Sequence, residues 1–104
     1  MKAVMVTAGA CGFDTRVEVH PKGKFTYALT FDTKCPYLLN FVRELPSFNL
    51  VEEMRNVFGV KIRDAALKTI MGSCAGCAVI PAIFKAAQVE SGFALACTSA
   101  INFE

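Results

Sequence analysis

Residues 72–85 read GSCAGCAVIPAIFK, and this stretch decides most of what the sequence predicts. It places Cys74 and Cys77 in a C-x-x-C spacing, in a turn of small residues that leads into an apolar segment. Pro81 suits the first turn of a helix, so we expect the last helix to begin between Cys77 and Pro81 and to run to Glu90. Thiols at a helix start lie near the positive end of the helix dipole. This favours thiolate, the form that binds metal or attacks sulfur.

The composition describes a single globular domain, residues 1–104, that is large enough to bury its own core. The net charge is only +2 and the basic residues are scattered, so no nucleic-acid partner is expected. The apolar start of the chain stops at Gly9, which is too short for a signal peptide or a membrane span. We expect no membrane segment elsewhere and therefore a cytoplasmic location. The high apolar fraction, 54%, is compatible with a homodimer.

The clearest secondary-structure pattern is a hairpin within residues 13–31. Residues 15–20 and 25–31 alternate between apolar and polar, and the turn 21–24 between them holds Pro and Gly. Residues 2–7 predict a third strand, buried on both sides. Besides the last helix, which ends at Glu90, helices are expected at 35–45, from Ser47 or Asn49 to Gly59, and at 61–71. Residues 93–103 predict a closing extended segment. Strands followed by helices indicate an α+β fold, a small three-stranded antiparallel sheet packed against three to four helices.

Five cysteines are many for this length, and their number is odd. Because nothing points to secretion, metal or redox chemistry is favoured over a disulfide framework. Cys11 lies in a glycine-flanked turn, Cys35 precedes Pro36 at a helix start, and Cys77 lies at the last helix start. These three cysteines are the predicted metal ligands, with Cys74 or Asp14 as further candidates.

Several alternatives stay open from the residues alone. Each cysteine can instead be a small buried hydrophobic residue, and Cys97, among Ala, Thr and Ser, is interpreted as structural. Asp14 can serve turn geometry, and His20, the only histidine, is expected on the surface. The chain has neither a Ser-His-Asp arrangement with a nucleophile elbow nor a phosphate-binding loop, and nothing in it requires an enzyme.

The order of these elements resembles the iron–sulfur cluster scaffold family, of the IscU type and the NifU N-terminal type. The resemblance spans roughly Gly9 to Gly92. It rests on Cys11-Gly12 leading into the hairpin, on Cys35 opening the following helix and on Cys77 opening the last helix. Where the family has Asp two residues after its first cysteine, this chain has Phe13, and Asp14 follows. Gly76 stands where the family often has His, so Cys74 is expected to compensate as a fourth thiolate. The family's Leu-Pro-Pro-Val-Lys segment, which its chaperone recognises, has no match.

This resemblance implies a SufE/NifU-like fold and a protein that binds zinc or a labile iron–sulfur cluster. It also implies a cysteine desulfurase or an apo iron–sulfur acceptor protein as partner. The sequence is similar, too, to small cysteine-containing proteins of anaerobic bacteria and archaea, which imply no function. Two other hypotheses remain. In one, a low-pKa thiol, Cys77 or Cys35, accepts sulfur as a persulfide, or Cys74 and Cys77 cycle as a disulfide. In the other, the protein is a metal-free structural or interaction protein.

Overall fold

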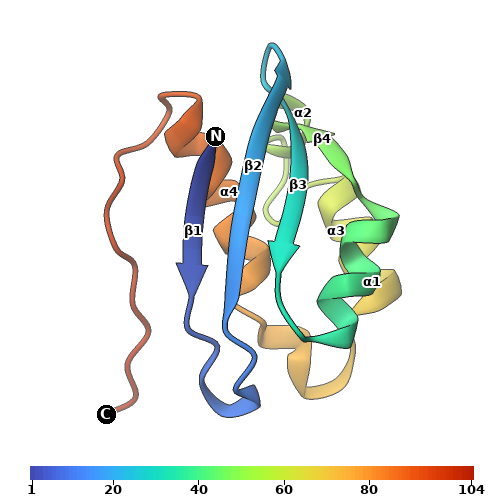
Figure 1. Ribbon diagram of the computed structural model, residues 1–104, viewed down its shortest axis with the longest axis vertical. Coiled ribbons are helices and arrows are strands. Elements are labelled where there is room, and N and C mark those ends of the chain that lie inside the picture. Colours follow the sequence, from blue (N-terminus) through green and yellow to red (C-terminus); the bar gives the residue numbers. More distant parts are fainter.

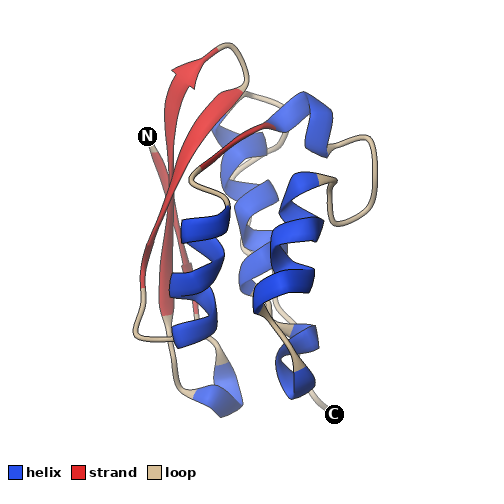
Figure 2. Ribbon diagram, turned by 90° about the vertical axis from the view of Figure 1, so that its right-hand side faces the viewer, coloured by secondary structure: helices blue, strands red, loops and turns tan.

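A computed structural model, which describes all 104 residues, shows an antiparallel sheet with helices on one face (Figures 1 and 2). Its strands are β1 (Lys2–Val6), β2 (Thr15–Gly23), β3 (Thr26–Asp32) and β4 (Ser47–Asn49), in the order β1-β2-β3-β4. The α-helices are α1 (Pro36–Glu44), α2 (Leu50–Glu53), α3 (Lys61–Thr69) and α4 (Val79–Glu90), and the 3₁₀ helices are η1 (Gly9–Cys11) and η2 (Gly72–Gly76). The predicted α+β class is confirmed, with four strands instead of three.

The predicted hairpin is formed by β2 and β3. Val17 pairs with Phe31 and Val19 with Leu29, and both valines are fully buried, as the alternation predicts. Strand β2 continues beyond the predicted turn to Gly23, with a register shift between Pro21 and Gly23. Proline has no N–H to donate, so a bulge at this place lets the strand pass it.

Strand β1 is not buried on both sides as predicted. It lies at the edge of the sheet, where only β2 pairs with it, and Met5 on its outer face is 63% exposed. Helices cover the inner face alone: α4 packs on β1 and β2, while α1 packs on β3 and on α3. Figure 2 shows the two layers, with the sheet on one side and the helices on the other.

Helix α4 is the central helix of the core. Its buried residues are Val79, Ile80, Ala82, Ile83, Ala86 and Ala87. The stretch Gly72–Glu90 has the length and mean hydropathy of a membrane span, whereas no membrane segment was predicted. However, this stretch is divided into η2 and α4, and α4 places its apolar side against the sheet. Packing in the core therefore explains the hydropathy of α4.

Two further segments differ from the sequence-based prediction. Strand β4 was missed because its residues Ser-Phe-Asn are too few to show alternation, and α2 accordingly begins only at Leu50. The helix also ends at Glu53, well before the predicted end at Gly59. The Asn49 side chain caps α2 by accepting a hydrogen bond from the Glu52 N–H at 3.1 Å. The C-terminal segment from Phe93 is extended as predicted. It does not close the sheet, because it forms no strand and Ala94–Glu104 are exposed.

A buried carboxylate fixes the connection between α2 and α3. Glu53 is 1% exposed, and its oxygens accept hydrogen bonds from the N–H groups of Val60, Lys61 and Ile62 at 3.0, 3.2 and 2.7 Å. These N–H groups lie at the start of α3 and have no partner within the helix, so Glu53 satisfies them. Gly59 permits this approach, because a Cβ there would lie 2.7 Å from Glu53 Oε1.

Candidate functional site

The three turns that carry Cys11, Cys35 and Cys77 lie at the same end of the molecule. Antiparallel pairing brings the end of β1, the start of β2 and the end of β3 together, with Arg16 opposite both Met5 and Asp32. Cys11 follows β1 in η1, and Cys35 follows β3 as the N-cap of α1. Figures 1 and 2 show η2 and the start of α4, where Cys77 lies, at this same lower end.

A hydrogen-bonded pair of threonines joins the Cys11 turn to the Cys35 turn. Thr33 Oγ1 accepts from the Cys35 N–H at 3.2 Å, and the fully buried Thr15 places its hydroxyl 2.9 Å from Thr33 Oγ1. The same Thr15 hydroxyl lies 3.1 Å from the carbonyl oxygen of Phe13, in the turn that carries Cys11. We call Thr15 and Thr33 the threonine clamp. It fixes the backbone before α1 against the segment that follows Cys11.

Cys77 lies between η2 and α4, and its position is held by Cys74. The Cys77 N–H donates to the Cys74 carbonyl oxygen at 3.0 Å, so the C-x-x-C segment forms one tight turn. The Cys77 and Cys35 side chains are both half-buried and pack against the hydrophobic core, whereas Cys11 is exposed. The four thiols thus range from the core boundary to the surface.

Burial raises the pKa of the Cys77 thiol, and negative charge on Cys35, Cys74 and Cys11 raises it further. A hydrogen bond from the Val79 backbone N–H acts in the opposite direction but is outweighed. The expectation that the helix start would favour thiolate at Cys77 is therefore wrong, because desolvation exceeds the effect of the helix N-terminus. The same balance places Cys35, Cys74 and Cys11 each within electrostatic range of Cys77, although Cys11 and Cys35 are far from Cys77 in sequence.

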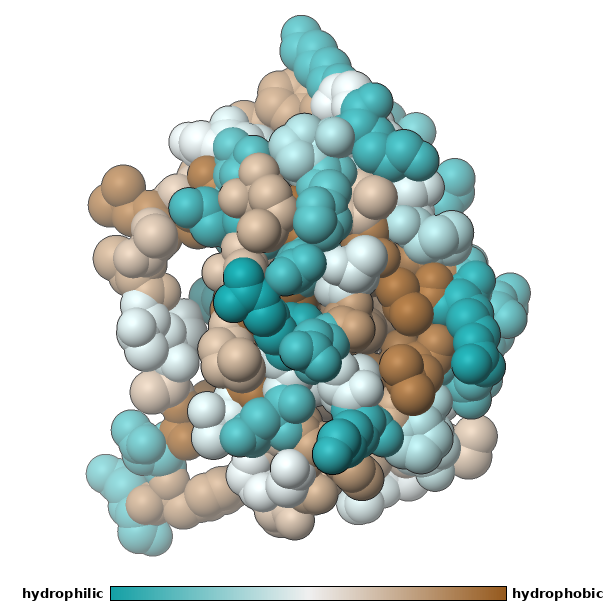
Figure 3. Space-filling view, in the orientation of Figure 1, coloured by the Kyte–Doolittle hydropathy of each residue, from teal (hydrophilic) through white to brown (hydrophobic).

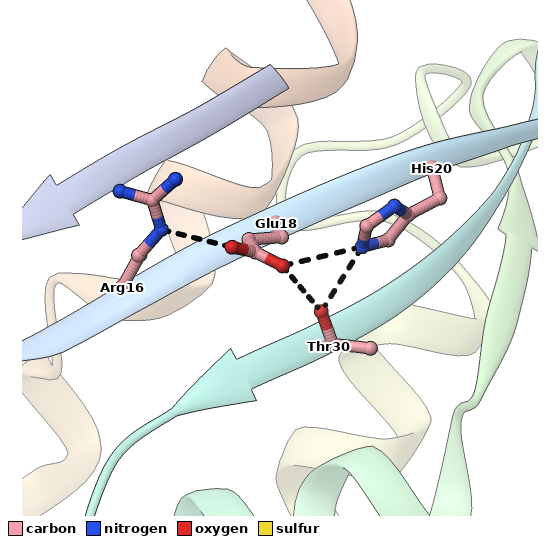
Figure 4. A network of polar contacts seen from close by, with 4 residues as sticks. All are labelled: Arg16, Glu18, His20 and Thr30. Atoms are coloured by element: carbon pink, nitrogen blue, oxygen red, sulfur yellow. Dashed lines mark hydrogen bonds and ion pairs between the residues drawn. The ribbon is translucent and has the colours of Figure 1, made fainter. Parts of the chain in front are cut away.

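The other candidate residues have different surroundings. Asp14 Oδ1 accepts a hydrogen bond from the Ala8 N–H at 3.0 Å, so it serves the turn around η1. His20 lies on the outer face of the sheet, as expected of a surface histidine, 3.3 Å from Glu18 Oε1 and 3.3 Å from Thr30 Oγ1 (Figure 4). Arg16 completes this network at 2.8 Å from Glu18 and lowers the pKa of that carboxyl. Cys97 is exposed in the C-terminal segment, so it does not fill the core.

The thiols have the right chemistry for a thiophilic metal but are not assembled as a coordination shell. All five cysteines are free thiols, and no three His, Cys, Asp or Glu side chains are arranged to hold one metal ion. Neither η1 nor η2 contains a buried residue, so little packing opposes a local movement of either segment. A shallow pocket of about 300 Å³ opens beside the Cys11 and Cys35 turns, but none of the four cysteines lines it.

Sequence reasoning missed the threonine clamp. Thr15 is predicted only as part of the strand 15–20, and Thr33 lies between the predicted hairpin and the helix at 35–45 without a predicted role. A signal was present, because Thr33 stands two residues before Cys35, the spacing at which a threonine hydroxyl can accept from a backbone N–H. The link to Thr15 depends on strand pairing and has no signal in the sequence.

The comparisons with known proteins identify a family and nothing more. The model of a family of unknown function (DUF6951) matches residues 2–103, so the chain belongs to that family. Neither the curated proteins nor the solved structures contain a match.

Proposed function

We propose that this member of the DUF6951 family binds a thiophilic metal ion or a labile iron–sulfur cluster through Cys11, Cys35 and Cys77, with Cys74 as the fourth ligand. The observation that carries the proposal is the gathering of four thiols at one end of the sheet, seen in the meeting of their turns and in the electrostatic effect of three of them on Cys77. Thiolate ligands suit zinc and iron–sulfur clusters equally.

Cys74 is preferred to Asp14 as the fourth ligand. Negative charge on Cys74 acts on the Cys77 thiol, whereas Asp14 is not among the groups that do so. One Asp14 oxygen is also occupied by the Ala8 N–H. A site of four sulfurs would form when η1 and η2 move toward the more firmly packed Cys35 and Cys77. This movement changes two short 3₁₀ segments and leaves the sheet and α4 in place.

The threonine clamp supports such a site by positioning. It sets the N-cap residue Cys35 against the β2 side of the Cys11 turn without contacting metal itself. Groups that orient metal-binding residues by hydrogen bonds form the outer shell of a metal centre, and their loss typically weakens metal binding 10–100-fold.

The raised pKa of Cys77 bears on its own part in the sulfur-transfer alternative. A thiol that is protonated near neutral pH is a poor nucleophile, which disfavours Cys77 as a persulfide acceptor. A metal ion displaces that proton when it binds, so a raised pKa is compatible with ligation. If a cluster is bound, the partners would be a cysteine desulfurase or an apo acceptor protein, and the reducing cytoplasm would keep the thiols free.

Metal titration of the reduced, metal-free chain tests the proposal. Zn²⁺ is titrated against a chromogenic chelator, and Fe²⁺ with sulfide is added anaerobically to a parallel sample. We expect about one Zn²⁺ per chain, or a coloured cluster, with binding lost in Cys77→Ser and Cys35→Ser. Cys97→Ser is the matched control and should bind like the unmodified chain.

The titration also has outcomes that count against metal binding. Absence of saturable binding of either metal would favour a metal-free structural or interaction protein. A single fast-reacting thiol that is indifferent to chelator would favour sulfur transfer instead. Binding that survives in Cys77→Ser would show that the metal is held elsewhere.

A further inference from the structure

The C-terminal tail, residues 93–104, has the residue pattern of a half-buried strand that is not used in the fold. Large apolar residues and Cys97 occupy odd-numbered positions, Phe93, Leu95, Cys97, Ile101 and Phe103, with Ser99 as the one interruption, and Ala, Thr, Asn and Glu occupy the even-numbered positions. In the structure the members of this set beyond Phe93 face solvent, with Leu95 and Ile101 86% exposed and Phe103 fully exposed. From Thr98 onward the tail makes no backbone hydrogen bond.

Strand β1 offers the unpaired sheet edge that such a segment lacks. The other edge strand, β4, has only three residues and directly follows Pro46, features that protect an edge from pairing. Strand β1 has five residues, contains no proline or bulge, and carries a single charge, at Lys2. Its N–H and C=O groups on the side away from β2 are therefore free to pair with another strand.

The exit of the tail from α4 directs it away from its own β1. The N–H groups of Phe93 and Ala94 both donate to the Gln88 carbonyl oxygen, and the Phe93 ring lies 5.2 Å from the Phe25 ring. In Figure 1 the tail runs beyond β1 and in the same direction, and in Figure 2 the C-terminus lies on the helix side while the N-terminus lies on the sheet side. Pairing within one chain would be parallel, the less stable arrangement.

We propose that two copies of the chain exchange their C-terminal tails, each tail adding antiparallel to β1 of the other copy. The alternation places one apolar face of each tail toward the helix layer, beside Val4 and Val6, and the polar face outward with Met5. Figure 3 shows the hydrophobic atoms of the tail standing apart from the body of one copy. The twelve tail residues and the five of β1 from each copy approach the ~20–30 residues per side of a stable interface.

This proposal does not depend on metal binding, and its test is run in chelator and reductant so that neither metal nor disulfides can link two chains. Sedimentation of the full chain over a concentration series should show a dimer. Ile101→Asp, on the apolar face of the tail, should raise the dimer dissociation constant at least about tenfold. Ala100→Asp adds the same charge on the opposite face and should leave the dimer intact.

Circular dichroism should show that a chain ending at Gly92 is folded, and sedimentation should show that it is a monomer. Amide exchange should be slowed in β1 and in the tail of the full-chain dimer only. The proposal is overturned if the full chain is monomeric at every concentration. This holds both if the tail amides of that monomer exchange freely and if they are protected because the tail pairs with β1 of its own chain. A dimer that persists in the chain ending at Gly92 or in Ile101→Asp would also overturn it.

Discussion

Replacing Thr33 by valine should weaken metal binding while leaving the fold intact. Thr33 Oγ1 accepts from the Cys35 N–H at 3.2 Å and from the buried Thr15 hydroxyl at 2.9 Å. Valine keeps the size and β-branched shape of threonine but removes the acceptor. Thr15 can still donate to the Phe13 carbonyl oxygen at 3.1 Å, so the Cys35 N–H is the group left without a protein partner.

The magnitude follows from those two contacts. Each hydrogen bond contributes a net ~0.5–1.5 kcal/mol, so the free energy of unfolding should fall by about 1–3 kcal/mol. Because the clamp positions Cys35 against the Cys11 turn, Zn²⁺ affinity should fall about 10–100-fold. Urea unfolding of the metal-free chain measures the first quantity, and competition with a chromogenic chelator measures the second.

Two matched variants complete this experiment. Thr33→Ser restores the hydroxyl and should recover most of the affinity. Thr30→Val makes the same substitution on the exposed outer face of the sheet, where Thr30 contacts Glu18 and His20, and should leave the affinity unchanged. If Thr33→Val loses stability but keeps Zn²⁺ affinity within twofold, the clamp is structural and does not position a ligand.

Three further predictions concern pH, the buried carboxylate and the fourth thiolate. The raised Cys77 pKa means that the folded chain keeps this proton to a higher pH than the unfolded chain does, so the contribution of Cys77 to the stability of the metal-free protein should be constant below about pH 8.5 and decline above it. Cys77→Ala should flatten the decline at alkaline pH in urea titrations, and an equally steep decline would place its origin elsewhere. Gly59→Ala introduces a Cβ at φ +84° and 2.7 Å from Glu53 Oε1, so calorimetry should show a loss of about 2 kcal/mol or more, compared with little change for Gly23→Ala, whose Cβ meets only Thr26 at 4.0 Å. Cys74→Ser should weaken Zn²⁺ binding while Asp14→Asn changes it little, and the reverse order of affinities would make Asp14 the fourth ligand.

The sequence predicted those parts of the fold that rest on local patterns. Alternation gave the β2–β3 hairpin and its buried valines, and proline and glycine placement gave the extent of α1 and α4 within a residue or two. Strand β4 escaped because three residues carry no period. Glu53 lies within the helix predicted from Ser47 or Asn49 to Gly59, and its buried role escaped prediction because its partners in α3 are brought to it only by tertiary packing.

The site was predicted in outline only. The cysteines stand at turns, and turns can be recognised from Gly and Pro, so the candidate ligands could be named from the sequence. Whether their sulfurs meet depends on strand pairing and on the packing of α4, neither of which is local. The protonation of Cys77 was predicted with the wrong sign, because its burial against the core is invisible in the sequence while its place at a helix start is not.

The most direct test of the thiol site is the alkylation of individual cysteines with and without metal. The reduced chain is treated with iodoacetamide in chelator and, separately, after loading with Zn²⁺, and each cysteine is quantified by peptide mass spectrometry. The proposed site predicts that Zn²⁺ protects Cys11, Cys35, Cys74 and Cys77 together, while Cys97 reacts equally in both samples. Equal labelling of all five cysteines with and without Zn²⁺ would contradict it.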